Sequence, residues 1–301
     1  MLLEQAFFDQ SEAAGSDEPA VADRFRPHAV AVDGPLRPYV TSLLGVEVGA
    51  LPPMQLSVVP HEALMLYVQI GRGADCLEQK AERGLHTRMT GIRRHVGRFV
   101  PPGNCQTVFA MLTPLGAVNL LGAPLDDIER VGAPAARLLD LRTTRALELD
   151  IAAAAGMHEK LERFGRWLEA RVSAGTDSST PARRAARTAM RIYDDPSTGT
   201  ESLAQSESVT RRQLERDMRR WLNVSPNQLA HVARLQALSR HAMRGRPLAH
   251  IAADLGYADQ AHMSRTVKSL TGTTPRGLVR AGGNPMALAF RRATGGGVVY
   301  L

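Results

Sequence analysis

The hydrophobic pattern of this chain of 301 residues changes its period once, and this change limits the possible folds more than any other feature. Between residues 39 and 121, short β-prone runs alternate with Gly- and Pro-rich turns, a pattern typical of an antiparallel sheet or small barrel. After Pro124 the apolar residues recur at helical spacing. We therefore expect an α+β protein whose N-terminal antiparallel β domain ends in helices and is followed by an all-α domain. The predicted strands are residues 56–59, 64–70, 97–100 and 107–112.

The chain length and one polar segment predict two domains. A chain of this length is too long for one ordinary core and suits two domains of roughly 100 to 200 residues. Residues 173–183 are small and polar, which is typical of an interdomain linker. The acidic residues 1–20 predict a disordered leader. The other predicted segments are a first domain at 21–172, a second at 184–281 and a tail at 282–301.

Positive charge is concentrated in the second domain. Residues 1–180 carry 18 Lys and Arg against 22 Asp and Glu, whereas residues 181–301 carry 19 against 8. The two parts therefore have net charges of −4 and +11 within a total of +7. Neutralising phosphates with Lys and Arg releases counterions and supplies most sequence-independent DNA affinity. The asymmetry thus predicts a polyanionic partner for the second domain.

Two short helices joined by a tight turn are predicted near the end of the second domain. Pro247 suits the start of the first helix. Gly256 stands where that helix ends with a left-handed residue, and Asp259 suits the N-cap of the next helix, in which Met263 and Val267 point inward. This order is that of a helix-turn-helix unit. The outer face of its second helix carries side chains that pair with base edges or phosphates, and these are Gln260, His262, Ser264, Arg265 and Lys268.

An earlier segment repeats this scheme. A short helix through residues 203–204 and a turn at 207–209 precede a helix from Thr210 to Leu222. Thr210 with Gln213 three residues later predicts a capping box. The outer face of this helix is rich in arginine, which favours contact with phosphates and bases, with a merely solvated face as the alternative. The site residues predicted there are Arg211, Arg212, Glu215, Arg216 and Arg219.

A long helix is predicted between the two units. Ser225 and Pro226 supply N-cap and first-turn signals, and apolar residues recur at helical spacing as far as about Met243. At a rise of 1.5 Å per residue its length is about 27 Å, which approaches the roughly 34 Å of one DNA turn. Such a rod predicts two recognition helices in successive major grooves.

The motifs of both units resemble those of the AraC/XylS family of transcription regulators. Residues 256–265, Gly-Tyr-Ala-Asp-Gln-Ala-His-Met-Ser-Arg, and then residues 272–275, Gly-Thr-Thr-Pro, are similar to its second-unit signature. Residues 210–216, Thr-Arg-Arg-Gln-Leu-Glu-Arg, and residues 224–226, Val-Ser-Pro, are similar to its first unit. The similarity covers residues 184–281 and implies a sequence-specific DNA-binding regulator, activator or repressor.

The resemblance also implies which residues face bases. By motif position these are Arg212, Glu215 and Arg216 in the first unit, and Gln260, His262, Ser264 and Arg265 in the second. The sequence departs from the family where Met218, Met263 and Val267 replace the usual Phe, and Asp217 adds an acid to the first recognition helix. These departures put the base contacts of the first unit in doubt.

The resemblance further implies partners and a role for the first domain. Double-stranded DNA is the expected partner, and regulators of this family also work with RNA polymerase, a small-molecule effector or a second copy of the chain. The N-terminal part, through residues 108–116 and 120–122, resembles effector or sensor domains of cupin-like form. Its histidines are scattered and Cys76 and Cys105 lack metal-ligand spacing, so we expect no metal and no cofactor. No export signal or long apolar run is present, which predicts a cytoplasmic protein without a membrane partner.

Alternatives to this interpretation remain at three points. The first domain could be an enzyme that the second domain tethers to DNA, although no nucleophile elbow, phosphate loop or zinc signature occurs, and we expect no enzyme. The second domain could be a nonspecific architectural DNA binder, which would protect DNA diffusely rather than at a discrete site. For His262, a helix-surface or turn-capping role is as well supported as a base contact.

Overall fold

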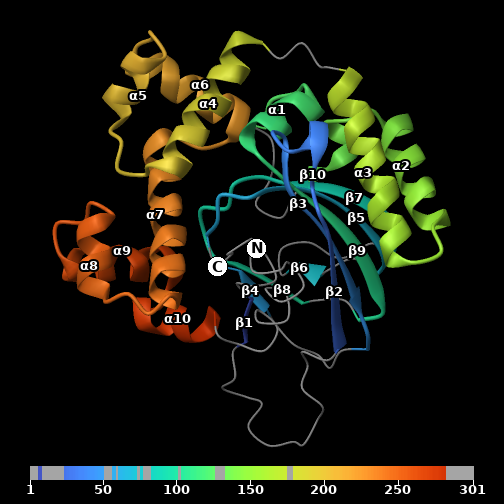
Figure 1. Ribbon diagram of the computed structural model, residues 1–301, viewed down its shortest axis with the longest axis horizontal. Coiled ribbons are helices and arrows are strands. Elements are labelled where there is room, and N and C mark those ends of the chain that lie inside the picture. Colours follow the sequence, from blue (N-terminus) through green and yellow to red (C-terminus); the bar gives the residue numbers. More distant parts are fainter. Residues whose placement is uncertain are drawn as a thin grey trace, which may run out of the picture.

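The computed structural model describes residues 6–8, 24–50, 56–58, 60–72, 75–76, 83–100, 103–125, 133–174 and 179–282. Two antiparallel sheets come first along the chain, and the described residues after them are nearly all helical (Figure 1). The structure confirms the α+β class and the N-terminal antiparallel sheet predicted from the change in hydrophobic period.

The larger sheet has six strands in the order β10-β7-β5-β9-β3-β2, and each neighbouring pair is antiparallel. Its central strand β5 places Leu66 beside Ala110 of β9 and Met89 of β7. All three are buried, so the middle of the sheet lies in the hydrophobic core. The strands are β2 (Phe25–Val30), β3 (Val40–Val48), β5 (Leu64–Arg72), β7 (Arg83–Thr90), β9 (Cys105–Leu112) and β10 (Ala133–Pro134).

The smaller sheet has four strands in the order β1-β4-β8-β6. They are β1 (Ala6–Phe8), β4 (Leu56–Val58), β6 (Asp75–Cys76) and β8 (Gly97–Val100). Strand β1 pairs antiparallel with β4 and lies inside the segment expected to be a disordered leader, most of which is outside the described residues. The short apolar run that forms β1 is long enough to pair once a partner edge is available.

Three helices cover one face of the larger sheet. They are α1 (Pro114–Leu121), α2 (Leu141–Ala153) and α3 (Met157–Ala174), with short 3-10 turns at Gly34–Leu36 and Ala135–Arg137. Helix α1 was not expected, because its segment was assigned to the β-prone region. It forms because Thr113 caps its N-terminus by accepting from the Gly116 amide at 2.9 Å and Gly122 ends it in a left-handed conformation.

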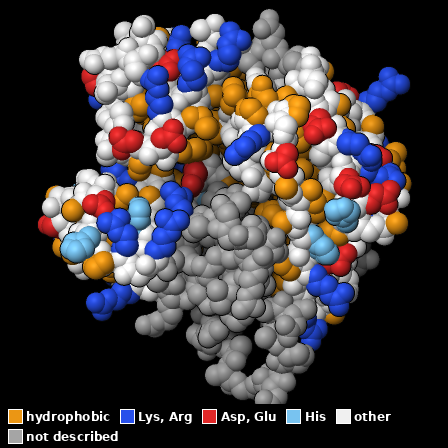
Figure 2. Space-filling model, viewed as in Figure 1, with side chains coloured by type: hydrophobic (Ala, Val, Ile, Leu, Met, Phe, Trp, Pro, Cys, Tyr) orange, Lys and Arg blue, Asp and Glu red, His pale blue; other side chains and the backbone are white. Residues whose placement is uncertain are grey.

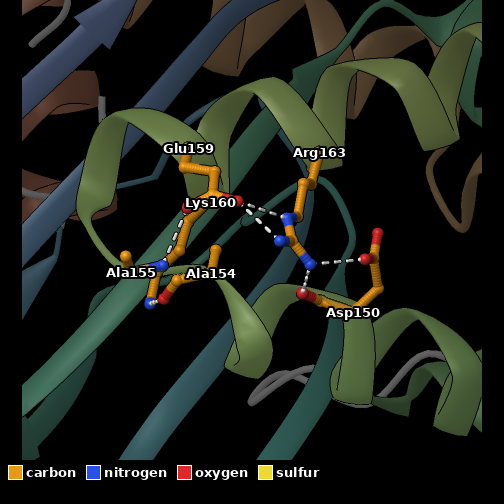
Figure 3. Close-up of polar contacts among 6 residues, drawn as sticks. All are labelled: Asp150, Ala154, Ala155, Glu159, Lys160 and Arg163. Carbon is orange, nitrogen blue, oxygen red and sulfur yellow. Dashed lines mark hydrogen bonds and ion pairs between the residues drawn. The ribbon is translucent and has the colours of Figure 1, made fainter.

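Charged side chains fix the turn between α2 and α3 (Figure 3). Arg163 of α3 donates to the carboxylate of Asp150 on α2 at 2.9 Å and to its backbone carbonyl at 3.0 Å. The same guanidinium also donates to Glu159 on its own helix. Lys160, which is buried, donates to the Ala154 carbonyl at 2.5 Å. These contacts hold the two covering helices against each other.

The remaining helices follow in sequence. They are α4 (Thr180–Asp194), α5 (Thr200–Ser206), α6 (Arg211–Leu222), α7 (Pro226–Met243), α8 (Leu248–Asp254), α9 (Gln260–Thr271) and α10 (Pro275–Gly282). Helix α3 ends at Ala174 and α4 begins at Thr180, so both ends of the predicted linker 173–183 are helical. Ser179 provides the N-cap of α4 and Pro181 stands in its first turn. The predicted tail lies outside the described residues except for Gly282.

A short stretch of the first domain, residues 60–62, contacts the C-terminal helices. The Pro60 carbonyl accepts from buried Gln236 of α7 at 2.7 Å, and the Glu62 carbonyl accepts from the Tyr193 hydroxyl of α4 at 2.9 Å. The Glu62 carboxylate lies 3.6 Å from the guanidinium of Arg240 on α7. Burial raises the pKa of Glu62, and the charge of Arg240 partly offsets this rise. The first domain therefore holds both α4 and α7.

We predict that Gly116→Ala destabilises the contact between α1 and the larger sheet. A Cβ atom at position 116 would lie 1.9 Å from the backbone oxygen of Tyr39, which cannot move without shifting the chain before β3. Overpacking of this kind lowers the free energy of unfolding by about 1–3 kcal/mol. Thermal and urea melts of the variant measure the loss.

Gly156→Ala is the matched control for this prediction, because a Cβ atom there meets nothing within 4 Å. Its stability should equal that of the wild type or exceed it slightly, since alanine restricts the unfolded chain. Equal stability of both variants would show that the packing of α1 on Tyr39 is not tight.

Candidate nucleic-acid interface

Helix α7 separates two helix-turn-helix units. The first unit, α5 and α6, lies at one end of α7, and the second, α8 and α9, lies at the other (Figure 1). The predicted inner face of α7 is confirmed at Leu229, Val232, Leu235 and Leu238, which are all buried. Ser225 caps the helix, and a reciprocal bond from its own amide to the Gln228 side chain completes a capping box. Both features make α7 a stiff spacer between the units.

The first unit begins with α5 and turns at Ser208, whose φ of 54° is left-handed. Thr210 caps α6 by accepting from the Gln213 amide at 3.2 Å. The predicted capping box is only half formed, because the Gln213 side chain donates to Asp217 instead of reaching back to Thr210. A side chain with a closer charged acceptor makes that bond in preference to the cap.

The outer face of α6 carries the predicted site residues. Arg211 forms an ion pair with Glu215 at 2.9 Å, so Glu215 is held by its own helix. Arg212 and Arg219 are exposed, and their guanidinium groups form no hydrogen bond or ion pair with any residue that the structure describes. Arg216 is exposed and donates to the Gln213 side-chain oxygen. The five predicted residues thus lie on one helix, and two of them, Arg212 and Arg219, have guanidinium groups free for a ligand.

Asp217 does not lie on this face. Its carboxylate is buried and accepts from Arg184 of α4 at 2.5 Å and from Gln213 at 2.6 Å. The sequence suggested an extra acid among the recognition residues, whereas the structure shows a link between two helices. Because Asp217 is three residues from Leu214 and four from Trp221, helical periodicity could have placed it on the inner face.

Helix α4 supports the first unit through further arginines. Arg187 forms an ion pair with Glu207 at the end of α5 at 2.5 Å, and Arg191 donates to Ser206. The opposite side of α4 is buried through small residues such as Ala182, Ala186 and Ala189. Sequence reasoning missed this role because the start of α4 was assigned to the linker. Its regular spacing of alanines and arginines is the signal that indicates an amphipathic helix.

In the second unit, Pro247 precedes α8 and Gly256 ends the turn with a φ of 71°, as predicted. Asp259 caps α9 by accepting from the His262 amide at 2.5 Å. Met263 and Val267 are completely buried, which confirms the predicted inner face of α9. Helix α9 ends at Thr271, and the residue after it, Gly272, is the C-cap and is also left-handed.

The outer face of α9 presents Gln260, Arg265 and Lys268, which are exposed and whose side chains form no hydrogen bond or ion pair within the described ranges. Ser264 is half-buried, and its hydroxyl donates to the Gln260 backbone carbonyl at 2.8 Å. That bond uses the hydroxyl proton and leaves the oxygen as an acceptor for a second donor. The structure therefore places an amide and two cations on a single helical face.

His262 has partners within the turn. Its ring packs edge-on against Tyr257, with the ring centroids 5.6 Å apart, and its Nδ1 accepts from the Ala258 amide at 3.4 Å. These contacts match the turn-capping alternative, while the imidazole stays exposed. His262 orients the start of α9 whether or not it also touches a base.

Lys and Arg side chains gather on one face of the helices of both units and of α7 (Figure 2). Figure 2 shows Lys and Arg side chains gathered over α4 and α6 and again over α7 and α9. Burial, followed by the charges of Arg234 and His262, lowers the pKa of His231 on α7. Burial, followed by the charge of Arg246, lowers the pKa of His241 near the other end of α7. A positive field that opposes protonation also attracts phosphates.

Other classes of site find little support in the described part of the chain. No three His, Cys, Asp or Glu side chains in the described ranges are arranged to hold a metal ion. None of the helices described is both long and apolar enough to cross a membrane.

Comparisons with known proteins identify the C-terminal region. Residues 203–281 match a family model described as a helix-turn-helix domain. No curated protein sequence matches the chain. The match confirms that residues 203–281, the region in which the sequence predicts both units, form a helix-turn-helix domain.

Several solved structures are similar to the chain. The C-terminal domain of AraT, a response regulator from Geobacillus stearothermophilus, is 24% identical over 35% of this chain and 88% of its own, with a TM-score of 0.31. ToxT from Vibrio cholerae is 9% identical over 87% of this chain and 100% of its own, with a TM-score of 0.45. The AraC-like transcriptional activator CuxR is 14% identical over 83% of this chain and 92% of its own, with a TM-score of 0.24.

We predict that Gly256→Val disorders the turn of the second unit. A β-branched residue at a φ of 71° is strained by about 1–3 kcal/mol, and its Cβ would also approach Ser197 at 3.6 Å. The variant should melt at a lower temperature and bind DNA more weakly. Ala258→Val, two residues away at an exposed position, adds the same side chain without left-handed strain and should behave as wild type. A wild-type melting curve for Gly256→Val would contradict the strained turn.

Proposed function

We propose that this protein is a DNA-binding transcription regulator of the AraC type that reads a specific site by placing α6 and α9 in two successive major grooves. The observation that carries the proposal is the geometry of α7, an 18-residue helix with a capped unit at each end. Its length of about 27 Å approaches one turn of DNA. Each unit offers unpaired cations on the outer face of its second helix, as phosphate and base contacts require.

The two helices have different chemistry for recognition. On α9, Gln260 suits adenine and Arg265 suits guanine, because each can form two bonds to the acceptor and donor pattern of that base. On α6 the exposed groups are almost all arginines, which suit phosphates as well as guanine. We infer that α9 contributes base discrimination and that α6 combines base contact with grip on the backbone.

The first domain is proposed to act on the spacing of the two units. Two features support this role: its residues 60–62 bond to α4 and α7, and α1 packs against α4. A change in the first domain would therefore reach the helices that carry both units. A small-molecule effector, RNA polymerase and a second copy of the chain are the partners proposed for such a regulator, which would act in the cytoplasm without catalysis.

A nonspecific architectural binder is the competing proposal. It would use the same cations, but it has no need for an amide such as Gln260 at a base-facing position. Footprinting of fragments that the purified full chain selects from genomic DNA distinguishes the two. A regulator should protect a discrete site of about two major grooves, whereas an architectural protein should protect DNA diffusely.

We predict separate effects for one arginine on each helix. Arg265→Ala should weaken binding to the selected site by about 1–3 kcal/mol and leave binding to scrambled DNA nearly unchanged, because a bidentate base contact is lost. Arg219→Ala, late in α6, should weaken binding to both duplexes. It should also flatten the plot of log affinity against log salt by about one unit, because one fewer counterion is released.

Titrations of both variants on the two duplexes at several salt concentrations test this prediction. Arg166→Ala, an exposed arginine on α3 in the first domain, controls for the loss of one positive charge and should bind both duplexes as wild type does. Equal weakening on both duplexes by Arg265→Ala would show that α9 does not read bases through that residue.

A further inference from the structure

A buried carboxylate lies under the most basic helix of the DNA-binding region. Asp217 is 4% exposed, while its neighbours Arg216 and Arg219 on α6 are exposed. Both of its oxygens are occupied: Oδ2 accepts from Arg184 of α4 at 2.5 Å, and Oδ1 accepts from Gln213 Nε2 at 2.6 Å. A buried carboxylate needs such partners, since an unpaired charge in this environment is costly.

The carboxylate determines which way the Gln213 amide points. An ionised carboxylate only accepts hydrogen bonds, so the NH2 group of Gln213 must face Asp217. The carbonyl oxygen of the amide then faces the opposite direction, where it accepts from the guanidinium of Arg216. Arg184, Asp217, Gln213 and Arg216 thus form one continuous chain of hydrogen bonds from α4 to the surface of α6.

Arg216 differs in this respect from the other predicted arginines on its helix. Arg212 and Arg219 form no hydrogen bond or ion pair with a described residue, and Arg211 is paired with a carboxylate, which neutralises it. Of these four, Arg216 is the one held by a neutral acceptor, so its position is restricted while its charge is kept. A guanidinium that is already oriented loses less conformational entropy when it binds.

We propose that Asp217 and Gln213 are positioning residues that orient Arg216 toward a base edge with two acceptors, as guanine presents in the major groove. This inference rests on the proposed function and names a determinant of its specificity. The Arg184 end of the chain lies on α4, which packs against α1 of the first domain. The orientation of Arg216 therefore depends on how α4 is seated.

Asp217→Asn tests the proposal directly. An Asn amide that keeps its oxygen toward Arg184 turns its NH2 toward Gln213, which must then rotate and direct its own NH2 at Arg216. Two donors repel, so Arg216 is released. Affinity for the selected site should fall about 2- to 10-fold, the range expected when one long side chain loses its preorganisation. Binding to scrambled DNA should not weaken.

The direction of this effect is diagnostic. Asp217→Asn removes a negative charge, and added positive charge by itself strengthens binding to any DNA. Asp254→Asn removes a carboxylate from a surface ion pair with Arg246 and provides the control for charge alone. The control should bind both duplexes as tightly as wild type or slightly more tightly.

Gln213→Met keeps the test decisive if Asp217→Asn fails to fold. It preserves the size of the side chain and the pair between Arg184 and Asp217 but removes the acceptor for Arg216. Both variants are also made in an Arg216→Ala background with the full chain, which completes double-mutant cycles. A residue that acts through Arg216 should have no further effect on the selected site once Arg216 is absent.

The outcomes separate this inference from the proposed function. If the wild-type protein binds the selected site and scrambled DNA equally well, both the proposed function and this inference are wrong. If the wild-type protein prefers the selected site but the Arg216→Ala variant binds it equally well, only the positioning role of Asp217 and Gln213 is wrong. If Asp217→Asn or Gln213→Met weakens both duplexes equally, or lowers affinity as much with Arg216→Ala as without it, the two residues are structural and the proposal is wrong. Selective loss that vanishes in the Arg216→Ala background supports it.

Discussion

Helix α7 is shared by two separate hydrophobic cores, and the arrangement of both DNA-binding units depends on this division. Its first half contributes Leu229, Ala230 and Ala233 to the core that also contains the first domain, α4 and α6. Its second half contributes Leu235 and Leu238 to a distinct core with α8 and α9. Packing fixes each unit to its own end of the rod, and the stiffness of a continuous helix sets the distance between them.

The two units use the same local devices but differ in how they are supported. Each recognition helix has a side-chain N-cap and a left-handed C-cap, at Asn223 in the first unit and Gly272 in the second. The first unit is also tied to α4 by ion pairs, one from Arg184 to Asp217 on α6 and one from Arg187 to Glu207 at the end of α5. The second unit packs on its own small core, the end of α7 and α10. A movement of the first domain would therefore reach α6 through α4, and α9 along α7.

The contact of residues 60–62 with α4 and α7 combines favourable and unfavourable terms. Gln236 and Tyr193 each donate a hydrogen bond to its backbone. Next to these bonds, His61 is completely buried, and its ring nitrogens have no hydrogen-bond partner among the described residues. Burial, followed by the charge of Arg93, lowers the pKa of His61 well below its usual value. Unsatisfied buried groups cost about 1–3 kcal/mol each, so His61 offsets part of what the two hydrogen bonds contribute.

Neighbouring residues in the chain are sufficient to specify the local structure of the DNA-binding region. Caps such as Asp259, the left-handed Gly256 and the apolar spacing of α7 depend on residues within a few positions of each other, so a single sequence is enough to predict them. The partners of each element, by contrast, came from tertiary packing. Strand β1 needs the edge of β4, and the role of α4 needs the face of α1. Asp217 appeared to belong to the recognition surface until Arg184, 33 residues away, gave it a buried partner. Contacts between distant segments depend on which faces are brought together by packing, and no local propensity encodes that choice.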